Sequence, residues 1–135
     1  MEPVMFGLFG KKIEEILGDG DYETSIAGVT HYQKNLEQVL KNLRDEEDGW
    51  HFTKATLRPD NRNKYDANAV AVEIDGKLVG YLPAVGKITR DDVNAIEFRD
   101  DYSDKSKAKQ FQVDCKLKKH YSGKIIGLLD IREDW

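Results

Sequence analysis

A few acidic and imidazole side chains stand where acid–base chemistry is conceivable. Asp60 and Asp66 lie close together in the chain and would serve as a general acid and base if their carboxyl groups met. His31 begins a segment with helical periodicity and would be a candidate base. Turn-bracing by the two aspartates, and capping or packing by the histidine, explain these residues more simply. The chain has no Gly-x-Ser-x-Gly elbow, no Gly-x-Gly-x-x-Gly loop and no P-loop, so we expect a protein that is not an enzyme.

The thiol and imidazole groups also argue against a metal or disulfide framework. Cys115 is the single cysteine and alternates with polar residues, which favours a small buried side chain over a nucleophile. The three histidines lack the spacing of a metal-binding pair. We therefore predict no metal and no cofactor.

The chain has no apolar run long enough to span a membrane. The order of charged and apolar residues at its N-terminus is not that of a secretory signal, so we expect a cytoplasmic protein with no membrane contact.

The charges are distributed in blocks. Lys+Arg number 21 and Asp+Glu 25 in 135 residues, a formal charge of −4 that excludes coating of nucleic acid by bulk charge. Residues 54–64 and 105–124 are nevertheless basic, whereas residues 44–48 and 97–104 are acidic. Aromatic side chains are interleaved with the basic residues, namely Trp50, Tyr65, Tyr81 and Tyr121. This pattern indicates a basic face that could stack bases, and its alternative is an ordinary solvated lysine-rich strand.

The elements that would position these residues follow from periodicity and turn signals. Residues 1–21 are expected to be an appendage containing a short amphipathic turn, and residues 22–135 to form the domain. Two helices are predicted, over 31–43 with Thr30 as N-cap and over 84–98, with a polar connection over 99–107. The expected strands are 24–29, 50–57, 70–74, 78–82, 111–117 and 125–131, with a loop over 58–64 and tight turns at Asp75-Gly76 and Ser122-Gly123. About six short strands and two helices indicate a mostly β, α+β fold, either a small antiparallel sheet or a partly open β-barrel.

One segment carries a family likeness. The stretch LRPDNRNKYDANAVAVEIDGKLVGYLP, from Leu57 to Pro83, resembles the core of the HIRAN domain, with its Tyr-Asp-x-Asn-Ala and Gly-Tyr-Leu-Pro elements. The upstream segment from Ile26 to Tyr32 resembles the opening strand of that family. The likeness covers residues 22 to about 131. It implies a compact antiparallel β-barrel related to the oligonucleotide-binding (OB) fold, in a stand-alone protein of the bacterial type.

The resemblance also implies a ligand. In the helicase-linked branch of the family, the domain holds the 3′-hydroxyl end of single-stranded DNA. Tyr65 then matches the base-stacking tyrosine, Asp66 the aspartate that contacts the hydroxyl, and Tyr81 a position that is often histidine. The sequence departs from the DNA-end binders at Thr24-Ser25, where they carry Arg-Tyr, and at Pro83-Ala84, where they carry a lysine.

The leading hypothesis is therefore a non-catalytic module that binds single-stranded DNA or its 3′ end, in DNA repair or replication. An ionised aspartate accepts a hydrogen bond from a hydroxyl but repels a phosphate, and a tyrosine face stacks a base. The residues expected to contact phosphates are Arg58, Arg62, Lys64, Lys116, Lys118 and Lys119. The alternative hypothesis is a protein-interaction adaptor whose residues 1–17 dock a partner.

Overall fold

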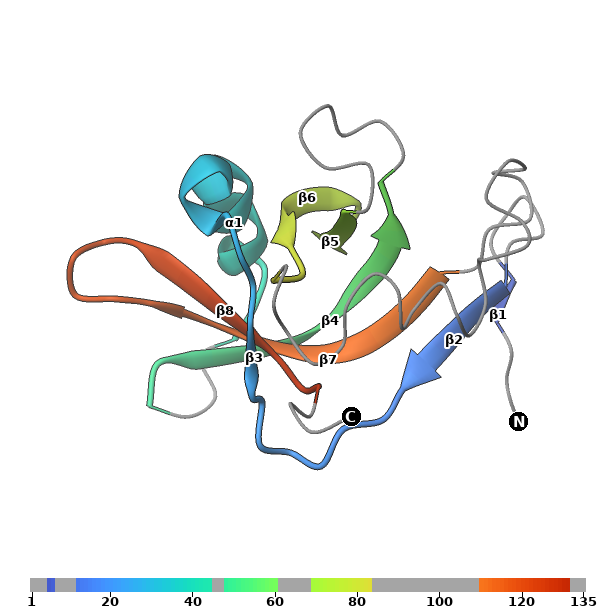
Figure 1. Cartoon of the computed structure of the whole chain (residues 1–135). Coiled ribbons are helices and arrows are strands. Elements are labelled where there is room, and N and C mark those ends of the chain that lie inside the picture. Colours follow the sequence, from blue (N-terminus) through green and yellow to red (C-terminus); the bar gives the residue numbers. More distant parts are fainter. Residues whose placement is uncertain (1–4, 7–11, 45–47, 61–68, 84–109, 132–135) are drawn as a thin grey trace.

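Two long strands form the centre of the computed structural model. β4 (Trp50–Pro59) and β7 (Gln110–Lys119) pair antiparallel, with Trp50 opposite Lys118 at one end and Leu57 opposite Phe111 at the other. β5 (Val70–Ile74) and β6 (Lys77–Tyr81) continue the sheet from β4 as an antiparallel hairpin (Figure 1). The structure describes residues 5–6, 12–44, 48–60, 69–83 and 110–131. The predicted helix over 84–98 and the connection over 99–107 lie outside these ranges.

The other edge of β7 is shared by two strands. β2 (Lys12–Ile16) pairs parallel with its first half, and β8 (Ile125–Leu129) pairs antiparallel with its second half. The two-residue strands β1 (Met5–Phe6) and β3 (Thr24–Ser25) pair with β2 and β8, respectively. Just after β3, Ala27 and Tyr81 exchange backbone hydrogen bonds of 2.8 and 2.9 Å, which bring this segment to β6. The mostly antiparallel sheet is thereby curled into a barrel-like shape.

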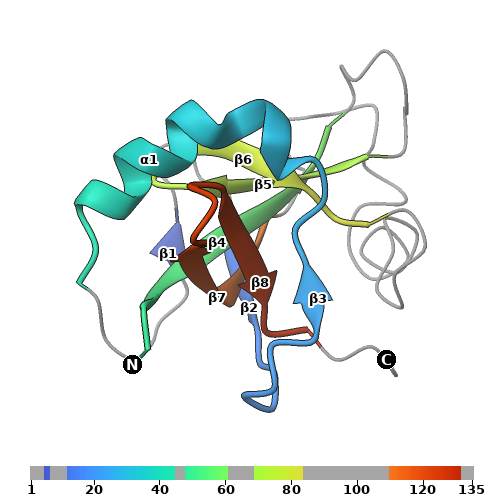
Figure 2. The same ribbon diagram turned by 90° about the vertical axis from the view of Figure 1, so that its left-hand side faces the viewer.

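The core lies inside this curl. Alternate residues of β7 are buried, as the period-2 pattern predicted, and they face the buried residues of β4, β5 and β8. A 3₁₀ turn, η1 (Val29–Tyr32), leads into helix α1 (Gln33–Lys41), which packs against β6 and β8 (Figure 2). Leu36 and Val39 are the side chains that α1 buries in the core. The largest fully buried side chains are Leu36, Leu57, Ile74, Leu117, Ile125, Leu129 and Ile131.

Two amides fasten α1 to the sheet. The side-chain amide of Gln33 donates to the carbonyl of Ile125 at 2.9 Å and accepts from its backbone N–H at 2.8 Å. It thus satisfies the backbone groups that a neighbouring strand would otherwise pair with. Asn35 donates to the carbonyl of Leu78 at 2.8 Å. None of the helices within the described ranges is long and apolar enough to cross a membrane.

Several element bounds differ from the prediction. The strand expected over 24–29 stops at Ser25, and Thr30 is not an N-cap, because Gly28 turns the chain with φ +75° into η1. The α-helix therefore begins at Gln33. The loop expected from residue 58 begins later, because Arg58 and Pro59 still pair with β5.

The N-terminal segment also differs. Residues 12–16 were expected to belong to an amphipathic turn, but they form β2. The reason is tertiary: the edge of β7 beyond β8 offers unpaired backbone groups, and Ile13 to Ile16 pair with Gln110 to Val113. Leu17, which follows β2, is exposed.

Gly80 sits where two backbones approach closely. A Cβ atom at this position would lie 2.5 Å from the carbonyl oxygen of Ala27, closer than non-bonded atoms approach. Only glycine therefore allows the Ala27–Tyr81 pairing that joins the segment after β3 to β6.

Candidate nucleic-acid interface

The outward side of β4 and β7 gathers aromatic and lysine side chains. Successive residues of a strand point to opposite faces, and the apolar members of β7 point into the core. Lys116 and Lys118 therefore point outward, and the register places Phe52 and Trp50 opposite them. Tyr22, from the segment between β2 and β3, completes the group. We call Tyr22, Trp50, Phe52, Lys116 and Lys118 the lysine–aromatic face.

The lysines of this face lie over the aromatic rings. The Nζ atom of Lys116 is 4.5 Å from the ring centroid of Trp50 and 4.8 Å from that of Tyr22. The Nζ atom of Lys118 is 5.4 Å from the Trp50 centroid. These distances are typical of cation–π contacts. Within the described ranges neither lysine makes an ion pair, so both charges can attract an anion.

Tyr22 is held in place by a buried carboxylate. Asp130 is 4% exposed and accepts hydrogen bonds from the backbone N–H groups of Gly20, at 3.0 and 3.1 Å, and Tyr22, at 3.2 Å. Tyr22 adopts a φ of +51°, a conformation that side-chain-bearing residues rarely take. Its ring packs edge-to-face on Phe52 at a centroid distance of 5.9 Å. Burial, followed by the charges of Asp114 and Asp130, raises the pKa of the Tyr22 hydroxyl.

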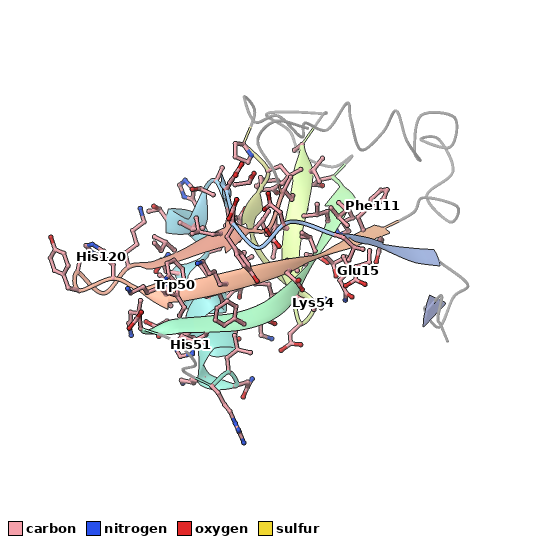
Figure 3. The ribbon with its side chains drawn as sticks, turned by 90° about the horizontal axis from the view of Figure 1, so that it is seen from below. Glu15, Trp50, His51, Lys54, Phe111 and His120 are labelled. Carbon is pink, nitrogen blue, oxygen red and sulfur yellow. The ribbon has the colours of Figure 1, made fainter. Side chains whose placement is uncertain are left out.

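Carboxylates close one end of the face. Lys54, the next outward residue of β4, pairs with Glu15 of β2 at 2.6 Å and with Asp114 of β7 at 2.7 Å. These hydrogen bonds raise the pKa of Lys54 to about 12. Figure 3 shows Lys54 and Glu15 toward one end of the sheet and Trp50 nearer the other. The positive charge of Lys54 is thus already compensated.

A second cluster surrounds Tyr81 at the far end of β4. The Tyr81 hydroxyl donates to Asp60 at 2.9 Å, and its ring lies 6.3 Å from the ring of Tyr32. Burial and the hydrogen bonds with Asp60 and Tyr32 raise the pKa of the Tyr81 hydroxyl. Arg58 forms hydrogen bonds of 2.9 and 2.6 Å with Glu73.

The residues that flank segment 61–68, Asp60 and Ala69, lie beside the same cluster. The backbone N–H of Asp60 donates to the carbonyl of Ala69 at 2.9 Å, so the residues on either side of that segment are neighbours beside Tyr81. Four predicted site residues belong to the segment and lie outside the described residues, namely Arg62, Lys64, Tyr65 and Asp66.

The described members of the predicted site therefore fall into two groups. Lys116 and Lys118 belong to the lysine–aromatic face, whereas Arg58 and Tyr81 belong to the second cluster. Trp50 and Arg58 stand near opposite ends of β4, roughly 25 Å apart along the strand at about 3.3 Å per residue. Lys119 joins neither group, because it pairs with Glu37 of α1 at 3.0 Å.

Sequence reasoning missed two members of the face. Phe52 could have been found, because it alternates with Trp50 in a predicted strand and must share its side of the sheet. Tyr22 had no local signal, because its position depends on Asp130, 108 residues away.

Three exposed carboxylates neighbour Tyr22 in the chain. Oxygen atoms of Asp19, Asp21 and Glu23 lie within 4.8 Å of one another. Exposed carboxylates of this kind are common without a metal, so we assign none there.

Comparisons with protein-family models, with curated proteins and with solved structures find no match to this chain.

Proposed function

We propose that this protein is a non-catalytic module that binds single-stranded DNA through the lysine–aromatic face. The observation that carries the proposal is the placement of Lys116 and Lys118 over the ring of Trp50, with neither lysine in an ion pair among the described residues. Lysine side chains contact phosphates, and unpaired bases stack on aromatic rings at the surface, such as that of the half-buried Trp50. A duplex hides the faces of its bases, so the ligand of such a surface is a single strand.

The resemblance to the HIRAN domain supports the same ligand class from a separate part of the chain. Under this proposal the curled sheet is an OB-related barrel, and Tyr65 and Asp66 receive the 3′ end beside Tyr81. Two structural facts favour it. Gly80 of the Gly-Tyr-Leu-Pro element is required by the close approach of Ala27. The residues that flank segment 61–68, Asp60 and Ala69, are hydrogen-bonded to each other, and Asp60 binds the Tyr81 hydroxyl.

Fluorescence anisotropy with labelled oligothymidylates tests the proposal. We expect binding whose affinity falls steeply with salt, because phosphate contacts release counterions. Trp50→Ala should weaken binding about five- to hundredfold, the effect of removing one base-stacking ring. The control variant Lys77→Ala removes a lysine from β6, away from the face, and should leave the affinity unchanged. If the full chain binds no single strand even at low salt, the proposal is wrong.

The end contact is tested separately. We expect a strand with a 3′-hydroxyl to bind more tightly than one with a 3′-phosphate, because the Asp66 carboxylate would repel the added charge. Asp66→Asn should reduce this preference. Equal binding of the two strands would refute the role of Asp66 while leaving the lysine–aromatic face untouched.

A further inference from the structure

The lysine–aromatic face continues in one direction only. Toward β2, Lys54 is compensated by Glu15 and Asp114, and these carboxylates would repel phosphates. In the other direction, beyond Lys118, β7 leads into the hairpin that connects it to β8. Figure 3 shows His120 at the tip of this hairpin, beyond Trp50.

The tip of the hairpin is cationic and aromatic. Its residues are Lys119, His120, Tyr121, Ser122, Gly123 and Lys124. Lys119 is paired with Glu37, whereas Lys124 is exposed and makes no ion pair with any residue that the structure describes. The tip therefore adds the charge of Lys124 at the end of the face away from Glu15 and Asp114.

The backbone of this tip is well fixed. The N–H of His120 donates to the carbonyl of Lys124 at 2.7 Å, and the N–H of Gly123 donates to the carbonyl of His120 at 2.8 Å. Gly123 takes the positive φ, +94°, that such a turn requires. The N–H of Ser122 also donates to the His120 ring nitrogen Nδ1 at 3.3 Å. A side chain projecting from this turn is thus held on a rigid base.

That side chain is Tyr121, which is 95% exposed. The ring of His120 lies tilted beside it, at a centroid distance of 4.0 Å and an interplanar angle of 40°. A large ring presented to water on a fixed turn can bind a planar group with little further loss of conformational freedom. Because the exposed cation Lys124 belongs to the same turn, an anionic ligand with planar bases suits it better than an apolar one.

We propose that Tyr121 is a second stacking platform, and that a bound single strand runs from Trp50 along β7 to the hairpin tip. This inference rests on the proposed function. Tyr121 lies three residues after Lys118, just beyond the end of β7, so the two are at most roughly 10 Å apart along the chain, which about three stacked nucleotides span at about 3.4 Å each. Short strands would then occupy the Trp50 end alone, and longer strands would engage both platforms.

The test compares two ligand lengths on the full chain. Labelled oligothymidylates of about two nucleotides, too short to reach from Trp50 to Tyr121, and of about ten nucleotides are titrated in low salt by anisotropy. We expect Tyr121→Ala to weaken binding of the longer strand about five- to hundredfold and to leave the shorter strand unchanged. Tyr121→Phe should retain the affinity of the original chain, because it keeps the ring. Leu17→Ala removes an exposed side chain just after β2, away from the hairpin tip, and should change neither affinity.

The outcomes separate the two proposals. If the unmodified chain binds the longer strand and Tyr121→Ala binds it equally well, the second platform does not exist. If Tyr121→Ala weakens both lengths by the same factor, the extended path is wrong. If the unmodified chain binds neither strand, the proposed function itself fails. Circular dichroism of each variant establishes that it is folded, as we expect for a side chain that is almost fully exposed.

Discussion

The carboxylate of Asp130 accepts a hydrogen bond from the backbone N–H of Tyr22 at 3.2 Å, across 108 positions of the chain. The same carboxylate binds the N–H of Gly20, and Gly18 packs directly against it. A buried anion with several backbone donors fixes the chain around it, because any other arrangement would leave the charge unsolvated. Asp130 thereby holds the ring of Tyr22 against Phe52 and beneath Lys116.

Removing this carboxylate should destabilise the protein. We expect Asp130→Ala to lower the free energy of unfolding by about 2 to 4 kcal/mol, because hydrogen bonds to a charged acceptor contribute about 1.5 to 3 kcal/mol each and are not fully additive. Asp130→Asn retains a carbonyl oxygen and should lose less. Urea denaturation measures both changes. Asp21→Ala removes an exposed carboxylate from the same segment and should stay within about 0.5 kcal/mol of the original chain. An equal loss for Asp21→Ala and Asp130→Ala would contradict the anchoring role of Asp130.

Two consecutive lysines should differ in their effect on DNA binding. Lys118 lies over Trp50 and makes no ion pair with the described residues, whereas Lys119 is paired with Glu37. Lys118→Ala should therefore weaken single-strand binding and lower the slope of log affinity against log salt by about 0.7, the value for one phosphate contact. Lys119→Ala should change the slope less. Anisotropy titrations over a series of salt concentrations give both slopes, and a larger change for Lys119→Ala would oppose the assigned face.

Cys115 should make stability fall at high pH. Burial raises the pKa of its thiol well above the ordinary value, because the core does not solvate a thiolate. The unfolded thiol ionises near about pH 8.5, so above that pH the unfolded state loses a proton that the folded state keeps, and stability declines. We expect this group to remove about 1 to 2 kcal/mol between neutral pH and about pH 10.

Denaturation of the original chain and of Cys115→Ala at both pH values isolates this effect. The variant should lose less stability on alkalinisation, because tyrosines and lysines titrate in both proteins. A thiol reagent offers a second measurement: the folded chain should react slowly, and the chain in denaturant should react at once. Rapid labelling of the folded protein would contradict the buried, protonated thiol.

Gly80 should tolerate substitution poorly. Gly80→Ala places a Cβ atom 2.5 Å from the Ala27 carbonyl oxygen, and a backbone atom cannot move aside as a side chain does. We expect a loss of about 3 kcal/mol in the free energy of unfolding. The matched glycine is Gly76, in the hairpin between β5 and β6, where an added Cβ meets nothing within 4 Å. Gly76→Ala carries the strain of φ +74° alone and should lose about 1 kcal/mol. Similar losses of unfolding free energy in the two variants would show that the close approach of Ala27 to Gly80 does not contribute to stability.

Local patterns in the sequence predicted much of the sheet. The alternation of Phe111, Val113, Cys115 and Leu117 identified β7 and its buried face, and the Asp75-Gly76 pair identified the turn between β5 and β6. These succeed because side-chain alternation and turn conformation depend on residues that are adjacent in the chain. The start of α1 was misplaced because Gly28 allows a 3₁₀ turn first, a local alternative that periodicity does not distinguish.

The pairing partners and the members of the lysine–aromatic face were decided by tertiary structure. Nothing near residues 12–16 indicates that they form β2, since their partners are the distant backbone groups of β7. Likewise, the lysines of β7 were recognisable as basic, but their availability depends on partners from other elements: Glu37 engages Lys119, and no described carboxylate engages Lys118. Alternation encodes the face on which a side chain lies, whereas the neighbours that it meets there depend on register and on contacts between segments far apart in the chain.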